Sequence, residues 1–172
     1  MNMLILGGES QRHQVWVREL ASALEPNADD LRILDYRHWQ TNSPTIDVEY
    51  EIEQAARNAP DEPYVVVAKS MGSVVTTLAV SRGLLKPDRC IFMGFPLAVV
   101  MANLPEVAAA LPKLPPTDFL HNTADPLGSF QAVQAYITAH SPAHFTCCEL
   151  PGDTHDYSDF NRIKQLLDSP RS

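Results

Sequence analysis

The sequence lacks several features that would assign it to a particular class of protein. Its 172 residues contain three cysteines, Cys90, Cys147 and Cys148. An odd number of cysteines in strand-like segments indicates small apolar core residues rather than a disulfide framework. No apolar run approaches the length of a membrane span, and the first residues lack the basic and long apolar segments of a secretory signal. We therefore expect a cytoplasmic protein with no membrane partner.

Motifs for metals, nucleotides and nucleic acids are also missing. The six histidines form no metal-ligand spacing and no H-E-x-x-H string occurs, so neither a metal nor another cofactor is expected. The string GGESQR does not supply G-x-G-x-x-G, and no G-K-[ST] string is present. The net charge is −8, and the 13 lysines and arginines are scattered rather than gathered in a stripe. A small molecule is a better candidate partner than a nucleic acid.

What the sequence does contain is an alternation of β-rich and helical segments. Six strands are predicted at Met3–Leu6, Leu31–Asp35, Tyr64–Ala68, Arg89–Met93, Thr117–His121 and Phe145–Leu150. Helices are predicted near Gln14–Leu24, Asp47–Asn58, Met71–Leu84, Leu127–His140 and Asp159–Leu167. This alternation predicts a single domain over residues 1–172, an α/β/α sandwich of three layers with a mostly parallel sheet of about six strands.

The segment VVVAKSMG, residues 65–72, runs from the third predicted strand into a helix through Ser70. This nearly matches the G-x-S-x-G turn called the nucleophile elbow, which holds a serine hydroxyl at the carboxyl end of a sheet. Ala68 replaces the first glycine. A serine between a strand and a helix can also be an ordinary N-cap. On the first interpretation Ser70 is a nucleophile, and the N–H of Met71 can face a developing oxyanion.

A serine nucleophile needs a base, and the base needs a group that orients it. Asp125 follows the fifth predicted strand and His155 follows the sixth, which gives the order Ser, Asp, His. Asp125 could instead cap the helix predicted from Leu127, and an isolated loop histidine is often only solvated. The shared order and sheet edge favour His155 as the base and Asp125 as its orienting acid.

The loop after the first strand, Gly7-Gly8-Glu9-Ser10, is the candidate for a second oxyanion donor. Two glycines allow the backbone N–H groups to turn toward the site. The N–H of Glu9, or less favourably that of Gly8, is the expected donor, and the Glu9 carboxylate is expected to point into solvent.

One stretch, Phe95–Pro116, is apolar and rich in proline. It could line a substrate pocket through Phe95, Pro96 and Leu97, since pockets are mostly apolar. It could equally be a core-packing helix over Glu106–Leu111. The segment is too short for a substantial lid, which predicts an open, shallow site.

Four strings together carry a family resemblance, namely AKSMG at 68–72, GFPL at 94–97, DPLG at 125–128 and GDTH at 152–155. Over essentially its full length the chain resembles a small, lid-free member of the α/β-hydrolase superfamily. Among its branches, the chain is most similar to short bacterial serine hydrolases and dienelactone-hydrolase-like proteins. The resemblance implies Ser70 as nucleophile, His155 as base, Asp125 as its orienter, and an oxyanion hole from Met71 and Glu9. Gly7 departs from the family, in which a His-Gly pair often begins this loop.

Two classes of function follow. The first is a serine hydrolase that cleaves a small carboxylic ester or thioester through an acyl-enzyme, and the same triad would also serve amide or C–C bond cleavage. The second is a non-catalytic interaction scaffold that keeps the elbow as a structural turn. An apolar sheet edge would permit a homodimer.

Overall fold

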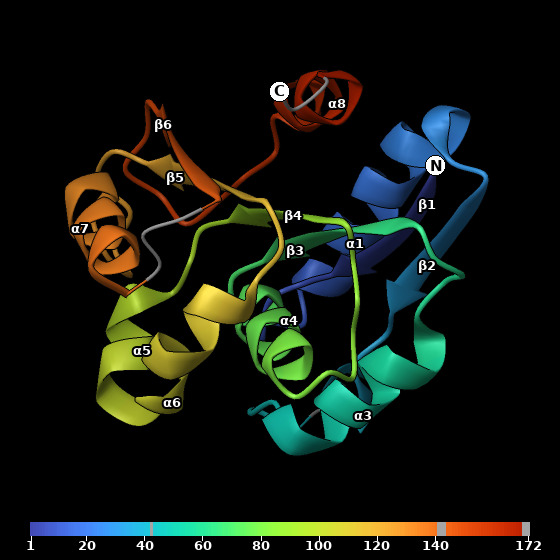
Figure 1. The fold of residues 1–172 in the computed structure, drawn as a ribbon, viewed down its shortest axis with the longest axis horizontal. Coiled ribbons are helices and arrows are strands. Elements are labelled where there is room, and N and C mark those ends of the chain that lie inside the picture. Colours follow the sequence, from blue (N-terminus) through green and yellow to red (C-terminus); the bar gives the residue numbers. More distant parts are fainter. Residues whose placement is uncertain (42, 141–143, 170–172) are drawn as a thin grey trace.

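A computed structural model describes residues 1–41, 43–140 and 144–169 of the chain. Its centre is a sheet of six strands in the order β2-β1-β3-β4-β5-β6, with every neighbouring pair parallel (Figure 1). The strands are β1 (Asn2–Leu6), β2 (Asp30–Leu34), β3 (Tyr64–Lys69), β4 (Arg89–Met93), β5 (Thr117–Asn122) and β6 (Phe145–Leu150). The predicted α/β/α sandwich with a parallel sheet is therefore confirmed.

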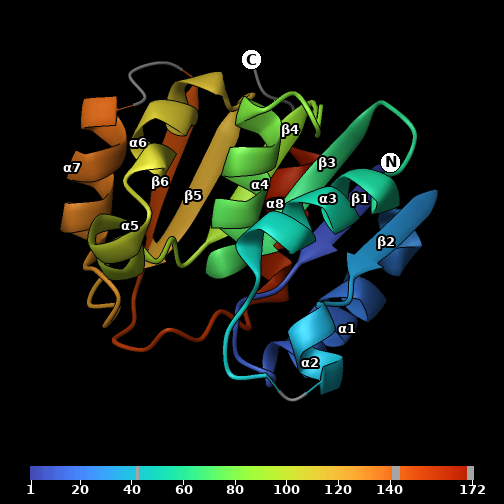
Figure 2. The same ribbon diagram turned by 90° about the horizontal axis from the view of Figure 1, so that it is seen from below.

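The helices form the two outer layers of the sandwich (Figures 1 and 2). Helices α1 and α8 contact each other on one face of the sheet, while α3, α4, α6 and α7 cover the other face. The α-helices are α1 (His13–Leu24), α2 (Arg37–Thr41), α3 (Val48–Asn58), α4 (Met71–Ser81), α5 (Leu97–Asn103), α6 (Glu106–Ala110), α7 (Phe130–His140) and α8 (Phe160–Asp168). Short 3₁₀ helices follow α1 and α6, at η1 (Glu25–Asn27) and η2 (Leu111–Lys113).

The central strand β3 is buried along its whole length, as expected for a parallel strand covered on both faces. Its middle is a run of three β-branched valines, Val65–Val67, which suits a pleated buried surface. Helix α4, which follows β3 directly, is also buried from Met71 through Ala79. Ser70 thus lies between two buried elements, which gives the turn between β3 and α4 a rigid support.

The strand order reverses beside β1. The chain passes from β1 to β2 on one side and then returns to β3 on the other side of β1. Ligands of open α/β sheets bind outside the carboxyl ends of the strands at such a switch point. The loops that follow β1 and β3, which contain Gly8 and Ser70, are therefore at the edge where a ligand site is expected.

Several boundaries differ from the sequence prediction. Helix α2 occupies a segment for which no helix was predicted, and α7 begins at Phe130 rather than near Leu127. Gly128 has a φ of 141°, which is incompatible with a helix that passes through it. Helix α4 ends at Ser81 rather than Leu84, because Gly83 turns the chain with a φ of 73°.

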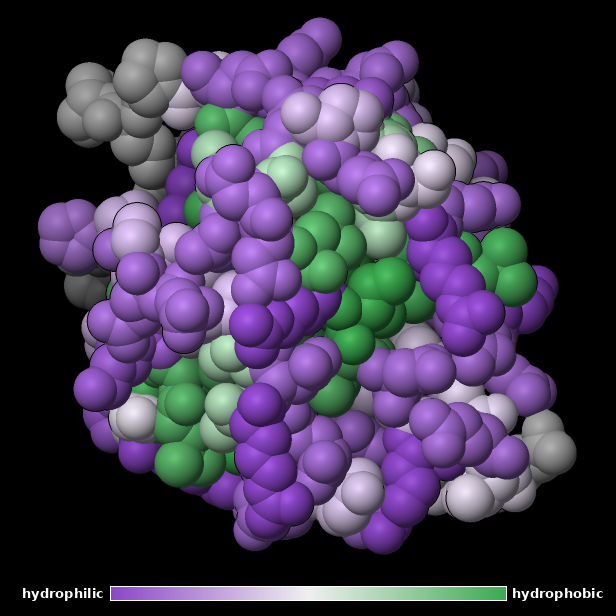
Figure 3. All heavy atoms as spheres, turned by 90° about the vertical axis from the view of Figure 1, so that its right-hand side faces the viewer, coloured by the Kyte–Doolittle hydropathy of each residue, from purple (hydrophilic) through white to green (hydrophobic). Residues whose placement is uncertain are grey.

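The side of the molecule that carries the edge strand β2 is mainly hydrophilic, with a band of hydrophobic side chains across its middle (Figure 3). Leu31 and Ile33 of β2 are partly buried against the core. None of the helices in the described ranges combines the length and the hydrophobicity that a bilayer crossing requires.

Candidate active site

Ser70 sits at the turn between β3 and α4 in a strained backbone conformation. Its φ is 51° and its ψ is −122°, a combination that costs about 1–3 kcal/mol for a residue with a side chain. The Ser70 side chain makes no capping hydrogen bond to the helix that it precedes. An ordinary N-cap serine has extended backbone and bonds an N–H of the first turn. The local geometry therefore matches the elbow interpretation and not the capping interpretation.

Two close contacts hold this turn in place. The Ser70 N–H donates to the Met93 carbonyl at the end of β4, over 2.9 Å. A Cβ at Gly72 would lie 2.6 Å from the Gly7 carbonyl oxygen and 2.8 Å from Leu6 Cβ. Only glycine allows α4 to approach the end of β1 so closely, which explains the second glycine of the elbow. The first elbow position tolerates Ala68, whose methyl group is accommodated in the core.

Asp125 lies in the loop after β5 and is 3% exposed. Its Oδ2 accepts hydrogen bonds from His155 Nδ1 at 2.7 Å and from the Tyr157 hydroxyl at 2.6 Å, and its Oδ1 accepts from the Leu127 N–H at 2.8 Å. Burial acts to raise the pKa of Asp125, but these hydrogen bonds outweigh it and lower the pKa below its usual value. Asp125 is thus an ionised carboxylate. It also caps a turn, although α7 itself starts only at Phe130.

His155 lies in the loop after β6, as predicted. Because its Nδ1 faces a carboxylate that can only accept, Nδ1 carries the proton and Nε2 presents a lone pair. The Nε2 atom is buried and has no hydrogen-bond partner among the described residues. This is the tautomer and the free nitrogen that a general base requires.

His155 and Ser70 each contact the chain at or just after the end of β4. A Cβ at Gly94 would lie 2.9 Å from His155 Cε1, the ring atom next to Nε2. The preceding residue, Met93, is the one whose carbonyl accepts the Ser70 N–H. The imidazole of His155 and the backbone N–H of Ser70 therefore both lie against the Met93–Gly94 segment. No hydrogen bond between the two residues is present in the described ranges, and such bonds often tighten only when substrate binds.

Two further histidines lie near the same place, and neither is equipped as a base. His121 is buried beside Gly128, whose carbonyl is 2.6 Å from Nε2, and burial lowers the pKa of His121. His13 packs against Gly8, since a Cβ there would lie 2.3 Å from His13 Nδ1 and 3.0 Å from Ser70 Cβ. Burial, with a contribution from the Lys69 charge, lowers the pKa of His13 to about 4. A nitrogen with so little affinity for a proton is a poor general base at neutral pH.

The loop after β1 is held from the side away from the sheet. The Glu9 carbonyl accepts hydrogen bonds from His38 Nε2 at 2.6 Å and Trp39 Nε1 at 3.2 Å. The Glu9 carboxylate accepts the Ile46 N–H at 2.9 Å, so it is tied to the segment before α3 instead of pointing freely into solvent as predicted. Within the described ranges, the N–H groups of Gly8 and Glu9 donate no hydrogen bond. The N–H of Met71, at the first position of α4, has no intrahelical partner.

Lys69, the residue before Ser70, is a buried cation that the sequence analysis did not single out. It is 2% exposed, and its Nζ lies 5.3 Å from the ring centroid of Trp16 and 5.9 Å from that of Tyr157. Burial lowers the pKa of Lys69 to about 8, although the charges of Asp156 and Asp125 act in the opposite direction. Its position at the end of a fully buried strand is the only sequence signal that could have marked it.

The segment that follows Gly94 was predicted to line a substrate pocket, to pack in the core, or both. Phe95, Pro96 and Leu97 are all buried, and the Phe95 ring packs against Phe119 and Tyr136 at centroid distances of 5.9 and 6.2 Å. The burial supports the core-packing interpretation of this stretch, which forms α5, α6 and η2. Its apolar character reflects its place between α4 and α7 in the core.

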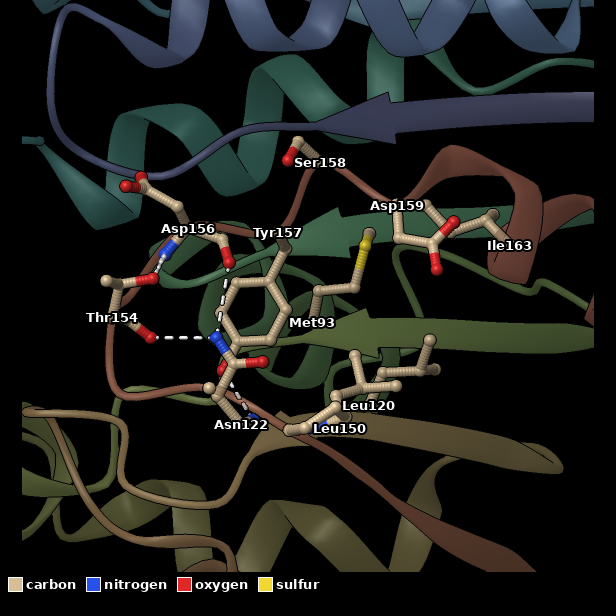
Figure 4. Close-up of a pocket in the computed structure, with 12 residues that line it drawn as sticks. Met93, Leu120, Asn122, Leu150, Thr154, Asp156, Tyr157, Ser158, Asp159 and Ile163 are labelled. Atoms are coloured by element: carbon tan, nitrogen blue, oxygen red, sulfur yellow. Dashed lines mark hydrogen bonds between the residues drawn. The ribbon is translucent and has the colours of Figure 1, made fainter.

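A cavity of about 260 Å³ lies instead between α8 and the ends of β4, β5 and β6 (Figure 4). Its apolar walls come from Met93, Leu120, Leu150 and Ile163, and Tyr157 also borders it. Among the described residues, no group of three or more histidine, cysteine, aspartate or glutamate side chains could hold a metal ion.

Comparison with solved structures identifies the fold. Alpha/beta hydrolase domain-containing protein 10 from mouse superposes with a TM-score of 0.74 at 13% identity, over 97% of this chain and 89% of the mouse chain. A thioesterase domain from the curacin biosynthetic pathway gives 0.70 at 14% identity, over 98% and 91% of the two chains. An alpha-beta serine hydrolase homologue from Coxiella burnetii gives 0.70 at 14% identity, over 96% and 83%. No family model and no curated protein matches the sequence. The chain has the α/β-hydrolase fold.

Proposed function

We propose that the protein is a serine hydrolase that cleaves a small carboxylic ester or thioester through an acyl-enzyme. Ser70 is the nucleophile, His155 the general base and acid, and Asp125 the group that orients His155. The N–H groups of Met71 and Glu9, with Gly8 as the alternative to Glu9, would hold the oxyanion. Ser70, Asp125, His155, Gly8 and Glu9 lie in turns or loops that follow strands, and Met71 is the first residue of α4, all at the carboxyl edge of the sheet, where ligands of this class of fold bind.

One observation carries this proposal. The partly buried imidazole of His155 donates Nδ1–H to an ionised Asp125 and keeps its buried Nε2 unengaged, and the strained backbone of Ser70 leaves that hydroxyl free of any capping role. Structural stability gains little from such an arrangement, because it stores backbone strain and leaves a buried nitrogen unpaired. Strain and unmade hydrogen bonds of this kind cluster at active sites.

The reaction would proceed in two halves. Ser70 Oγ forms a bond to the carbonyl carbon while its proton passes to His155 Nε2, and the negative charge moves to the carbonyl oxygen. The bond to the leaving alcohol or thiol then breaks, and the leaving group takes the proton from Nε2. In the second half a water molecule attacks the acyl carbon, His155 takes its proton, and the acid leaves as Ser70 regains the proton.

The preference for an ester or thioester rests on the functional groups that the site supplies. The proposed groups supply a nucleophile, one base and backbone donors, which is sufficient for a carbonyl with a good leaving group. The thioesterase domain and the serine hydrolase homologue named above share the fold and are consistent with this choice. Amide and C–C bond cleavage would use the same groups and are tested as alternatives.

The test compares wild type with Ser70→Ala on p-nitrophenyl esters of increasing acyl length and on the corresponding acyl thioesters. We expect turnover and covalent labelling by a fluorophosphonate probe in wild type, and loss of both in the variant by at least about 10³-fold. Ser81→Ala, a matched substitution at the end of α4 where the hydroxyl bonds only the Leu78 carbonyl, should behave as wild type. Folded wild-type protein that neither labels nor turns over any of these substrates would favour the non-catalytic scaffold.

A further inference from the structure

Three hydrogen bonds form a chain that ends on the proposed triad acid. The Asn122 N–H donates to the Tyr157 hydroxyl oxygen at 3.1 Å, and that hydroxyl donates to Asp125 Oδ2 at 2.6 Å. His155 Nδ1 donates to the same Oδ2 at 2.7 Å. A phenol has one proton, and its oxygen already accepts from Asn122, so the proton is directed to Asp125. One carboxylate oxygen therefore serves both Tyr157 and His155.

Contacts on several sides fix the position of Tyr157. The residue is 4% exposed, and its carbonyl accepts the indole N–H of Trp16 at 2.7 Å. Its ring meets that of His155 edge to face at 5.8 Å, and a Cβ at Gly94 would come within 2.5 Å of Tyr157 Cε2. Burial, together with the Asp125 charge, raises the pKa of Tyr157 far above its usual value. The hydroxyl thus stays protonated and remains a donor throughout the neutral range.

The loop that carries His155 is clamped by the same strand end. The side-chain amide of Asn122 donates to the carbonyls of Thr154 and Asp156, at 2.8 and 3.2 Å (Figure 4). These are the two residues on either side of His155. Asn122 therefore connects to both members of the acid–base pair, to His155 through its neighbours and to Asp125 through Tyr157.

We infer that Tyr157 is a positioning residue for the Asp125–His155 pair, holding Oδ2 in line with Nδ1 and drawing part of the carboxylate charge onto its own O–H. The inference rests on the proposed function and adds a residue to it. A hydrogen bond to a charged group is among the strongest that a side chain makes. The Tyr157 hydroxyl acts on the pair through Asp125, while its ring also contacts the ring of His155.

The inference has an electrostatic consequence. Charge that Tyr157 withdraws from Oδ2 is unavailable to the Nδ1–H of His155, so the hydroxyl weakens the attraction between the carboxylate and the imidazole. Other ionisable groups also act on this oxygen or on the imidazole. His121 Nε2 lies 4.0 Å from Asp125 Oδ2, Lys69 and Asp125 interact through their charges, and His13 senses the charges of Lys69, His155 and Asp156. These groups remain in place when the Tyr157 hydroxyl alone is removed.

The test is Tyr157→Phe, which removes one oxygen and keeps the ring, the backbone carbonyl and the contact with His155. We expect kcat to fall about tenfold with KM unchanged, because only the orientation of the acid–base pair is affected. We also expect the acidic midpoint of the kcat/KM profile to move to higher pH. Tyr136→Phe is the matched control, since its ring packs against Phe95 and His140 away from Asp125, and it should change neither quantity.

A second readout does not depend on turnover. The proton shared by His155 and Asp125 should give a low-field signal in the ¹H NMR spectrum, assigned by its loss in His155→Ala. We expect Tyr157→Phe to shift this signal and Tyr136→Phe to leave it in place. If Tyr157→Phe does not fold, 3-fluorotyrosine at position 157 keeps the O–H and makes it a stronger donor. The acidic midpoint and the NMR signal should then both move in the opposite direction.

The two proposals fail in different ways. An inactive wild type with a low-field signal that responds to Tyr157→Phe would end the hydrolase proposal and support the positioning role. An active wild type with Tyr157→Phe kinetics and signal equal to wild type would overturn the positioning role and leave the hydrolase intact. A fall in kcat that comes with a lower Tm, an unchanged midpoint and an unchanged signal would also overturn it, since those are the marks of a purely structural residue.

Discussion

The two halves of the candidate site are built in opposite ways. Around Asp125 and His155, donors and acceptors are matched by short hydrogen bonds, and both loops are clamped by Asn122 and Tyr157. Around Ser70, the backbone is strained, and the N–H groups of Gly8 and Glu9 donate no hydrogen bond within the described ranges. In the proposed mechanism, the acid–base half is complete before any ligand arrives, while the nucleophile half has donors that are still unengaged.

A physical reason accounts for the difference. Asp125 is a buried charge, and an ionised carboxylate away from water is costly unless several donors satisfy it. Backbone N–H groups carry only partial charges, so leaving them without a hydrogen bond until a ligand binds costs less free energy than leaving a charge unpaired. Preorganised donors that are unengaged in the resting state are also what stabilises charge that appears only during a reaction. The contrast between the halves therefore indicates where charge is permanent and where it is transient.

The largest expected effect tests which histidine belongs to the acid–base half. We expect His155→Ala to lower kcat/KM by at least about 10³-fold. His13→Ala should lower it by less than about tenfold, because burial holds the pKa of His13 near 4 and no carboxylate in the described ranges hydrogen-bonds its ring. Steady-state kinetics on the p-nitrophenyl esters measure both. Equal losses would place the base on the β1 side of Ser70 and abolish the distinction between the halves.

A second experiment acts on the unengaged donors. The Cβ added by Gly8→Ala would lie 2.3 Å from His13 Nδ1 and 3.0 Å from Ser70 Cβ, so the loop must shift. We expect kcat to fall about 10²-fold, as when an oxyanion donor is displaced. Gly83→Ala is the control, because its φ of 73° is strained but nothing lies within 4 Å of the new Cβ. It should lower the free energy of unfolding by about 1 kcal/mol and leave kcat unchanged.

The buried Lys69, next to Ser70, should make the free energy of unfolding depend on pH. The folded pKa of Lys69, near 8, lies below its ordinary value of 10.5. Between these pH values the unfolded chain binds more protons, so the free energy of unfolding rises with pH. Lys69→Met should lack this rise and be more stable than wild type at pH 7 by about 1–3 kcal/mol. Urea denaturation at pH 7, 8 and 10 measures the difference, and a parallel pair of curves would contradict the prediction.

The smallest expected effect concerns strain at the elbow. Glycine adopts a φ of 51° without the penalty that a side chain incurs, so Ser70→Gly should be more stable than Ser70→Ala by about 1 kcal/mol. Both variants lack the hydroxyl, so the comparison isolates the backbone. Thermal unfolding of the two inactive proteins measures it. Equal Tm values would mean that the turn relaxes once the hydroxyl is gone, and that the strain belongs to the serine rather than to the fold.

Much of the fold could be predicted from the sequence, because the spacing of hydrophobic residues and the residue types that favour turns are local signals. Strands β4 and β6 were predicted with the bounds that they have, and the loops that carry Ser70, Asp125 and His155 were placed at one sheet edge. Helix α2 was not predicted because contacts with distant parts of the chain stabilise it. Its two buried side chains, His38 and Trp39, both bond the carbonyl of Glu9 from 29 and 30 residues away.

The parts of the site that were not predicted depend on side-chain packing. Lys69 and His13 are separated by many residues, and only the completed fold brings the lysine charge close enough to lower the pKa of the histidine. The role of Tyr157 depends on the direction of one hydroxyl toward Asp125. Phe95 and Leu97 were predicted to line a pocket and are buried, and buried and pocket-lining apolar residues have the same composition. Composition alone cannot distinguish these two environments.

The two tryptophans of the chain provide a way to observe the halves separately. Trp16 donates its indole N–H to the carbonyl of Tyr157, and Trp39 donates to the carbonyl of Glu9. Each indole is thus hydrogen-bonded to one loop and its fluorescence responds to changes in that loop, and the Trp16 ring also lies 5.3 Å from Lys69 Nζ. Trp16→Phe and Trp39→Phe would each leave a single emitter, so the order in which the loops respond to an inhibitor could be followed in a stopped-flow fluorimeter without an attached dye.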